Sequence, residues 1–186
     1  MIDLHSHILP GIDDGARTLE ESVQLVSEMA KWGFERITCT PHITKKFRNT
    51  EESIREKFDI LSDAVISNGL DIELRMSAEY RLNPETWPEI LAQKQLMPIE
   101  DQYILMEFPI NDPSEMGGLI PMEEFRKVIS LGLTPVLPHP ERYFYLSHDE
   151  LLGYVDAGVK IQSNYGSLAG VYGAEVRERA QSLINE

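Results

Sequence analysis

Residues 1–16 read MIDLHSHILPGIDDGA and place two histidines and two aspartates before the first expected helix. The apolar run Ile2–His5 is typical of a short strand, and His7 follows His5 at a spacing of two. In extended backbone, side chains at that spacing point the same way, so both imidazoles can reach one metal ion. An isolated His-x-His also occurs as the polar end of a strand, so the rest of the chain has to decide between the two interpretations.

Short apolar runs alternate with helical patterns along the whole chain. The predicted strands are Ile2–His5, Arg36–Thr40, Asp71–Glu79, Gln102–Phe108, Thr134–His139 and Val159–Asn164. The predicted helices lie between Thr18 and Gly33, over Thr50–Ser67, Pro84–Gln93 and Met122–Leu131, between Ser147 and Gly158, and over Ala174–Ile184. This alternation implies parallel strands joined by right-handed crossovers, in either an open sheet or a barrel.

The position of the polar residues favours a barrel. Metal-ligating or polar side chains fall at the carboxyl ends of different predicted strands: His5 and His7, His42, Glu79, Glu107, His139 and Asn164. In a barrel these ends converge on one face, whereas an open sheet directs ligands to a single switch point. We therefore expect an α/β barrel-like fold in a single domain over residues 1–186.

The composition excludes several classes of function. The 186 residues include 17 basic and 31 acidic side chains, a net charge of -14 that disfavours nucleic-acid binding. No run of 18 apolar residues predicts a membrane span, and the N-terminus lacks a signal-peptide pattern. The single cysteine, Cys39, suits a reducing compartment, so we expect a cytoplasmic protein.

The candidate residues indicate metal chemistry. A carboxylate at the end of an apolar strand is costly to bury unless it is paired or metal-bound, which favours Glu79 and Glu107 as ligands. Imidazole and carboxylate ligands without thiolate suit Zn, Mn or Fe, and so many ligands require more than one ion. Adjacent metals are typical of hydrolysis, here of a phosphate ester. In the loop GIDDGA, Asp13 and Asp14 compete for one ligand role, because an aspartate there also suits a turn.

Basic residues near these ligands offer a phosphate site. Arg142 in HPERY suits bidentate phosphate binding or, equally, a surface salt bridge. The stretch KKFR at residues 45–48 either steers an acidic substrate or forms a solvated loop. A cysteine-type phosphatase needs an arginine six positions after its cysteine and a glycine-rich loop between them. Lys45 occupies that position after Cys39 and no glycine intervenes, which disfavours thiol catalysis.

Six stretches together carry a family resemblance: DLHSHILPGIDDG, CTPH, SAEY, LMEF, PHPERY and QSNYGSL. They resemble the PHP superfamily and, more closely, the manganese-dependent tyrosine-protein phosphatases of bacterial capsule and exopolysaccharide operons. The resemblance implies a distorted (β/α)7 TIM-like barrel with three metal ions, manganese first, with Fe or Zn as alternatives. The implied substrate is phosphotyrosine on the tail of a cytoplasmic tyrosine autokinase.

The resemblance also implies roles for individual residues. His5 and His7 would hold one metal, bridged through Glu79 to a second metal. The other implied ligands are Glu107 and His139 for the second metal, and Asp14 with His42 for the third. Arg142 would bind the phosphate, and a metal-bridging hydroxide would attack phosphorus.

The chain departs from the family pattern near its end. The family has a late Asp-x-His on its seventh strand, and no such motif follows Asn164. We therefore expect a barrel that is incomplete at the last strand, with exposed edges that favour a homo-oligomer. The alternative functions are a phosphatase for a small metabolite such as histidinol phosphate, and an inactive truncated binding or regulatory module. Metal-dependent amidohydrolases rank lower, because they usually carry lysine and histidine where this chain has Glu79 and Glu107.

Overall fold

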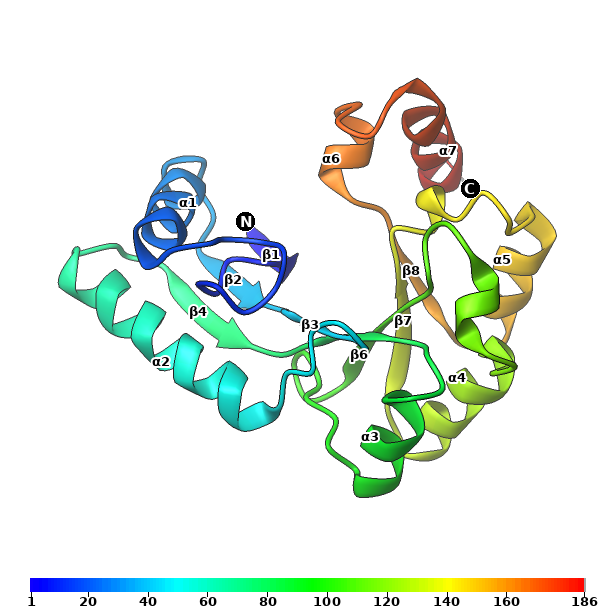
Figure 1. Cartoon of the computed structure of the whole chain (residues 1–186). Helices are drawn as coiled ribbons and strands as arrows, with labels where there is room; N and C mark the ends of the chain where they lie inside the picture. The colour runs from blue at the N-terminus through cyan, green and yellow to red at the C-terminus, as the bar shows by residue number, and fades with distance from the viewer. Residues whose placement is uncertain (186) are drawn as a thin grey trace.

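The computed structural model describes residues 1–185 (Figure 1). The strands are β1 (Ile2–Ser6), β2 (Arg36–Cys39), β3 (His42–Ile43), β4 (Glu73–Met76), β5 (Glu79–Arg81), β6 (Tyr103–Glu107), β7 (Thr134–Pro138) and β8 (Lys160–Gln162). The α-helices are α1 (Leu19–Lys31), α2 (Glu51–Ser67), α3 (Trp87–Gln93), α4 (Pro121–Ser130), α5 (His148–Asp156), α6 (Tyr165–Leu168) and α7 (Ala174–Ile184). Two 3-10 turns are η1 (Pro113–Met116) and η2 (Pro140–Arg142).

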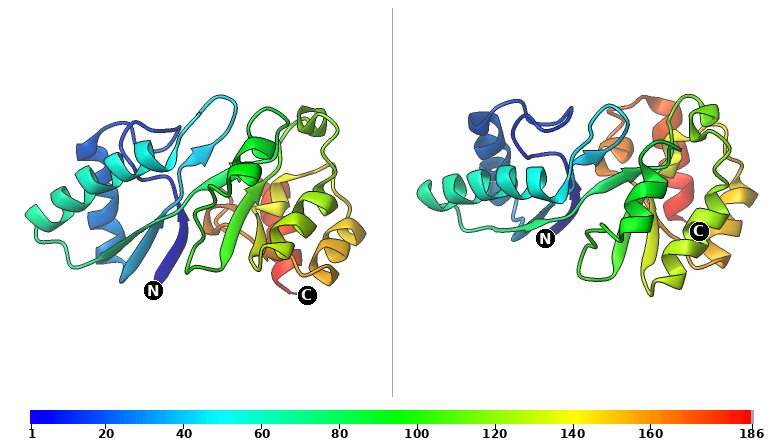
Figure 2. Two further views of the ribbon diagram at one scale, coloured as in Figure 1. Left: turned by 90° about the horizontal axis from the view of Figure 1, so that it is seen from below. Right: turned by 60° about the horizontal axis from the view of Figure 1, so that its bottom comes forward.

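The strands form two parallel sheets, in the orders β1-β2-β4 and β3-β5-β6-β7-β8. Helices α1 and α2 pack side by side, with α2 against β4, while α4 packs on β7 and α5 on β8. In Figures 1 and 2 these helices lie around the outside of the strands. The parallel strands and alternating helices confirm the predicted α/β class.

One predicted strand is divided in two, and another is followed by a short strand that was not predicted. Arg36–Thr40 continues past Pro41 as β3, and Asp71–Glu79 is divided into β4 and β5. Pro41 interrupts the pairing because proline lacks the N–H that a central strand needs. The break between β2 and β3 at Pro41 lies beside the break between β4 and β5 at Ser77. Backbone hydrogen bonds from Ser77 N to Cys39 O (2.9 Å) and from Glu79 N to Pro41 O (3.0 Å) still join the broken strands.

These breaks correct the predicted placement of two candidate ligands. His42 and Glu79 were expected at the carboxyl ends of strands, and instead they begin β3 and β5, where they face each other in register. The short second strands therefore carry both side chains beyond the first sheet and beside β6. The chain thus passes from the first sheet to the second between β2 and β3 and between β4 and β5, directly before His42 and Glu79.

The arrangement is open between its first and last strands. Among residues 1–185, no backbone pairing joins β1 to β8. The two strands nevertheless approach each other, because His5 Nδ1 lies 3.0 Å from Gln162 Oε1. This order of strands is consistent with the expected barrel that lacks its closing strand, but a closed barrel is not formed by the described residues.

Local capping explains where several helices begin. Thr18 caps α1 by accepting from Glu21 N, as its spacing predicts, although the Glu21 carboxylate accepts from Arg17 N instead of Thr18 N. Ser147 and Glu150 form a full capping box at the start of α5. Among residues 1–185, no helix is both long and apolar enough to cross a bilayer.

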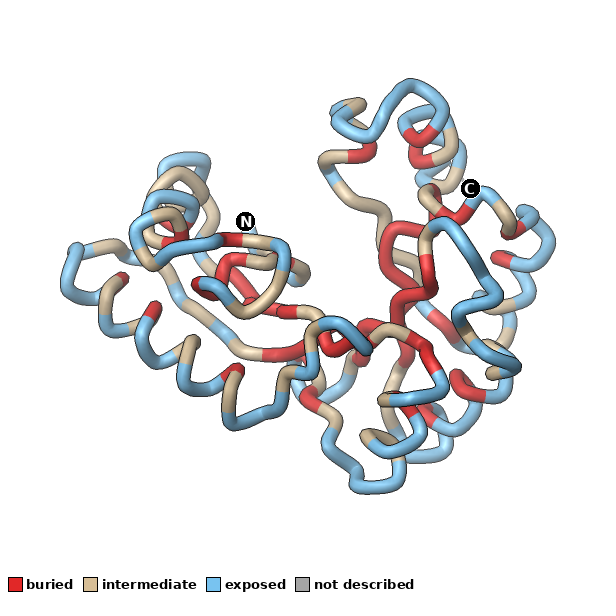
Figure 3. Tube along the Cα trace, in the orientation of Figure 1, coloured by how far each residue is buried: buried red, intermediate tan, exposed pale blue. Residues whose placement is uncertain are grey.

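The buried core supports the carboxyl ends of the strands. Figure 3 shows buried residues concentrated along the strands and on the inner sides of the helices. Phe108, directly after β6, stacks on Phe125 of α4, and Tyr143 accepts a hydrogen bond from Phe108 N at 3.0 Å. This packing fixes the segment that follows β7, from His139 to Tyr143, against β6.

Candidate metal centre

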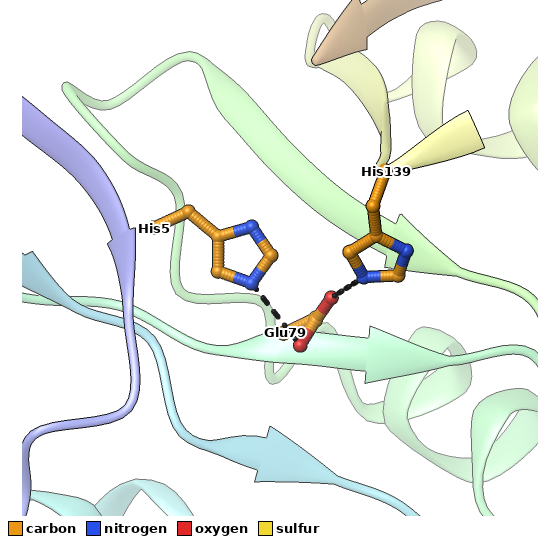
Figure 4. A group of neighbouring side chains, drawn as sticks. All are labelled: His5, Glu79 and His139. Carbon is orange, nitrogen blue, oxygen red and sulfur yellow. Dashed lines mark hydrogen bonds and ion pairs between the residues drawn. The ribbon is translucent and has the colours of Figure 1, made fainter. Parts of the chain in front are cut away.

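Glu79 lies at the centre of the candidate site and is fully buried. Its Oε2 is 3.2 Å from Nε2 of His5, 3.2 Å from Nε2 of His7 and 3.0 Å from Nδ1 of His42. Its Oε1 accepts a hydrogen bond from His139 Nε2 at 3.0 Å (Figure 4). Three imidazole nitrogens thus surround Oε2, which makes no hydrogen bond of good geometry with any of them. Donor atoms that converge without bonding each other are what a metal cluster requires.

Hydrogen bonds orient the rings of His5 in β1 and of His7 directly after β1 in the way that metal binding needs. His5 Nδ1 contacts Gln162 Oε1 at 3.0 Å, and His7 Nδ1 contacts Asp13 Oδ2 at 2.8 Å. Because both partners are oxygen acceptors, each Nδ1 donates its proton to an oxygen, and Nε2 is the nitrogen that faces the candidate metal site. The two Nε2 atoms lie 3.3 Å apart and both face Glu79. A ligating histidine usually donates its other ring N–H to such an oxygen.

Among residues 1–185, three groups of side chains have ligand atoms within 4.8 Å of one another; they include six of the seven predicted ligands, all but Glu107. These groups are His5, Glu79 and His139; His7, His42 and Glu79; and His7, Asp13 and Asp14. Glu79 belongs to two of them, as expected of a bridging carboxylate. The donors fit divalent metals, since all are imidazole nitrogens or carboxylate oxygens. The assignment of ligands to particular ions stays a prediction.

The two loop aspartates have different surroundings. The Asp13 side chain is fully buried and accepts from His7, from His42 N at 3.0 Å and from Gly15 N at 2.9 Å. The Asp14 side chain is 62% exposed, and its Oδ1 lies 3.4 Å from Nε2 of His42. Asp13 therefore orients His7, and Asp14 has oxygens free for a metal. This contrast supports the prediction of Asp14 as a ligand.

Gly15 brings this loop onto the first strand. A Cβ at Gly15 would collide with the carbonyl oxygen of His7, which accepts instead from Ala16 N at 3.0 Å. Only glycine allows this close approach, which places both loop aspartates beside His7.

Charge in the cluster is balanced by shared protons. Burial alone would lower the pKa of His7, but Asp13 and Glu79 raise it to about 9. Burial also opposes charge on His42, whose pKa Glu107 and Glu79 raise to about 10. Burial would raise the pKa of Glu79, yet the neighbouring imidazoles, His5 first, hold it well below its usual range. In the metal-free site the anionic Glu79 carboxylate therefore lies beside two protonated imidazoles, those of His7 and His42.

We expect metal binding at pH 7 to release about two protons per chain, since His7 and His42 must deprotonate before they ligate. Apparent metal affinity should rise as the pH increases toward 9. The stability of the metal-free protein should change with pH in the opposite direction. The raised pKa values of His7 and His42 contribute their full stabilisation below about pH 6.5. This stabilisation is lost as the pH rises through about 9 to 10.

Calorimetric titration with Mn²⁺ in buffers of different ionisation enthalpy measures this release. Asp13→Asn, which removes the carboxylate that raises the pKa of His7, should reduce the release by about one proton. A binding heat independent of buffer at pH 7 would contradict the assigned protonation states.

Glu107 lies in the same pocket but is already paired. Its Oε1 and Oε2 accept from Nε and Nη2 of Arg81 at 3.0 and 3.2 Å, and Oε1 is also 3.0 Å from His42 Nδ1. Sequence reasoning missed Arg81, although it lies two residues after Glu79 on β5, a spacing that places both side chains on one side of the strand. The predicted ligand role of Glu107 stays a prediction.

A pocket of about 420 Å³ collects these side chains from the carboxyl ends of β1, β6 and β7 and from the starts of β3 and β5. Its lining includes His5, His7, Asp14, His42, Glu79, Glu107 and His139, together with Arg81, Arg142, Asn164 and Tyr172. His139 adopts a left-handed backbone conformation (φ 40°) between two prolines, which is a strained setting for a non-glycine residue. All seven predicted metal ligands and Arg142 thus share one pocket.

The other basic residues singled out in the sequence are partly neutralised. Glu85 forms ion pairs with Lys45 at 2.5 Å and with Arg48 at 3.4 Å. Lys46 lies over the ring of Phe47, 4.5 Å from its centre. The ion pairs support the interpretation of KKFR as a solvated loop.

Cys39 is buried in β2, and burial raises the pKa of its thiol to about 12. A thiol of this kind is not a nucleophile near neutral pH, which agrees with the expectation that thiol catalysis is disfavoured.

Comparison with known proteins places the chain. The family model described as capsular polysaccharide synthesis, CpsB/CapC, matches residues 1–186. The chain belongs to the CpsB/CapC family. Tyrosine-protein phosphatase YwqE of Bacillus subtilis is 31% identical over 188 residues, a match covering 99% of this chain and 72% of YwqE. Tyrosine-protein phosphatase CpsB of Streptococcus pneumoniae is 32% identical over 178 residues, covering 88% of this chain and 67% of CpsB.

A solved structure extends the likeness to the fold. This structure belongs to a study of YwqE from Bacillus subtilis and CpsB from Streptococcus pneumoniae, which are described there as unique metal-dependent tyrosine phosphatases. It superposes on the present chain with a TM-score of 0.87 at 30% sequence identity. The match covers 100% of this chain and 74% of the other. The family resemblance seen in the sequence is thereby confirmed.

Proposed function

We propose that this chain is a metal-dependent phosphatase that hydrolyses phosphotyrosine in proteins. The observation that carries the proposal is the buried carboxylate of Glu79 among four imidazoles, inside a pocket that also contains an arginine. The relatives named above are tyrosine-protein phosphatases, and the solved relative is described as metal-dependent. The alternative of a small-metabolite phosphatase has no comparable support.

The chain's own residues have separate tasks in this reaction. Glu79 and the four imidazoles would hold the metals, and Asp13 and Gln162 orient the rings of His7 and His5. Metal ions bound there would neutralise phosphate charge and lower the pKa of water. Arg142, at the rim of the pocket, would bind phosphate oxygens through its N–H groups. No protein side chain is needed as a nucleophile.

The finer assignments are also proposals. Manganese suits the imidazole and carboxylate donors, as iron and zinc do, and the family resemblance favours manganese. The substrate would be the phosphotyrosine tail of a cytoplasmic tyrosine autokinase in capsule synthesis, which agrees with the capsular family of this chain.

Turnover of a phosphotyrosine peptide by the purified chain tests the proposal. We expect Mn²⁺-dependent release of phosphate that a chelator abolishes and added Mn²⁺ restores. Histidinol phosphate and a phosphoserine peptide serve as competing substrates. Absence of metal-dependent turnover of the phosphotyrosine peptide, or faster turnover of histidinol phosphate, would overturn it.

A further inference from the structure

Arg142 is held in an unusual way for an arginine in an acidic protein. Its guanidinium carbon lies 4.6 Å from the centre of the Tyr172 ring. Among residues 1–185 it forms no ion pair with a carboxylate, whereas Arg81 in the same pocket donates two hydrogen bonds to Glu107. The N–H groups of Arg142 therefore stay available, and those of Arg81 are largely used.

Tyr172 comes from the segment between α6 and α7, thirty residues after Arg142 in sequence. This segment folds back on the site, because α7 packs against both α6 and η2, the turn that contains Arg142. The Tyr172 ring also lies close to Gly166 of α6, where a Cβ would lie 3.3 Å from Cε2 of the ring. The position of the ring is thus set by backbone packing.

A ring face is a suitable support for a phosphate-binding arginine. It attracts the guanidinium through its quadrupole and leaves the N–H donors unused. A carboxylate support would take those donors and cancel the charge that a phosphate needs.

We propose that Tyr172 is a positioning residue that holds the Arg142 guanidinium over the metal pocket for phosphate binding. The inference rests on the proposed phosphate-binding role of Arg142 and adds a residue that acts through it. Both side chains line the pocket that contains the candidate metal ligands.

The test uses the metal-loaded chain, with inorganic phosphate as the binding probe and nitrophenyl phosphate as the substrate. Tyr172→Ala should weaken phosphate binding by about 3- to 30-fold, the range of a cation–π contact, and should raise KM more than it lowers kcat. Tyr172→Phe keeps the ring face and should behave like the wild type. Tyr165→Ala is the matched control, because Tyr165 lies nearby in sequence at the start of α6, is 81% exposed and lies outside the pocket.

A double-mutant cycle shows whether Tyr172 acts through Arg142. In an Arg142→Ala background, Tyr172→Ala should have no further effect on phosphate binding. Equal losses with and without Arg142, or unchanged phosphate binding in Tyr172→Ala, would overturn the inference. Metal content and melting temperature are measured for every variant, so that a loss of fold is recognised.

The inference and the proposed function can fail separately. If the wild type shows no phosphatase turnover but its phosphate binding depends on Tyr172 through Arg142, the inference is supported and the proposed function fails. If the wild type turns over phosphotyrosine and the cycle shows no coupling, the inference fails alone.

Discussion

Replacement of Glu79 by glutamine is expected to remove bound metal and to lower turnover of a phosphotyrosine peptide by roughly 10³-fold. The carboxylate takes part in two of the candidate metal groups and is fully buried. Glutamine keeps the shape but removes the negative charge that four imidazoles face. Several kcal/mol of metal-derived stabilisation would be lost with the ions, and each 1.36 kcal/mol corresponds to a tenfold change in rate.

Glu124→Gln is the matched control for this substitution. Glu124 is also buried, and its carboxylate accepts from Trp87 Nε1 at 3.0 Å and from Lys127 Nζ at 2.8 Å. These partners lie outside the metal pocket, so metal content and turnover should stay at wild-type values. Metal content is measured by elemental analysis beside the melting temperature. A Glu79→Gln variant that keeps its metal and its turnover would contradict the account of the site.

Replacement of Arg142 by alanine is expected to lower kcat/KM by about 10- to 100-fold while leaving metal content unchanged. A hydrogen bond to a charged group contributes about 1.5–3 kcal/mol, which corresponds to this range. The guanidinium lines the pocket and has no carboxylate partner among residues 1–185, so phosphate is the ligand that its charge can take. A variant that binds substrate more weakly but keeps its metal would show that Arg142 binds phosphate and is not a metal ligand.

Arg126→Ala is the control, because Arg126 is exposed on α4 and outside the pocket. It should leave kcat/KM unchanged. Arg142→Ala with wild-type kinetics, or with lowered metal content and normal phosphate affinity, would refute the assigned role. In that case Arg81, the other arginine of the pocket, becomes the candidate.

Much of the site followed from the sequence because its ligands are coupled to the strands. His5 lies near the end of β1, His7 directly follows β1 and His139 directly follows β7, so parallel strands bring them to one face. The pocket contains every predicted metal ligand, although His42 and Glu79 reach it from the starts of β3 and β5. Helix starts such as Ser147 were also predictable, since a capping box depends only on local spacing.

What the sequence did not predict depends on contacts between distant segments. The breaks in β2/β3 and β4/β5 match each other across the sheet, and only Pro41 gives a local sign of them. Asp13 was left as an alternative ligand, and its role as the partner of His7 requires the fold of the loop around Gly15. Tyr172 reaches Arg142 only because α7 packs on η2.

The site also explains how a chain of net charge -14 can bind an anionic substrate. The carboxylates of the pocket are matched by four imidazoles, by Arg81 and by Arg142. Metal ions would make the local charge more positive, so the pocket attracts phosphate although the surface repels it. The acidic surface and the phosphate chemistry are therefore compatible.

The most direct test of the central claim is anomalous diffraction from crystals of the chain grown with Mn²⁺. The account predicts peaks beside the Glu79 carboxylate, within ligand distance of Nε2 of His5 and of the His7 and His139 imidazoles. A fully manganese-loaded crystal with peaks only elsewhere, or with none in this pocket, would contradict the assignment of Glu79 and its histidines as the metal centre.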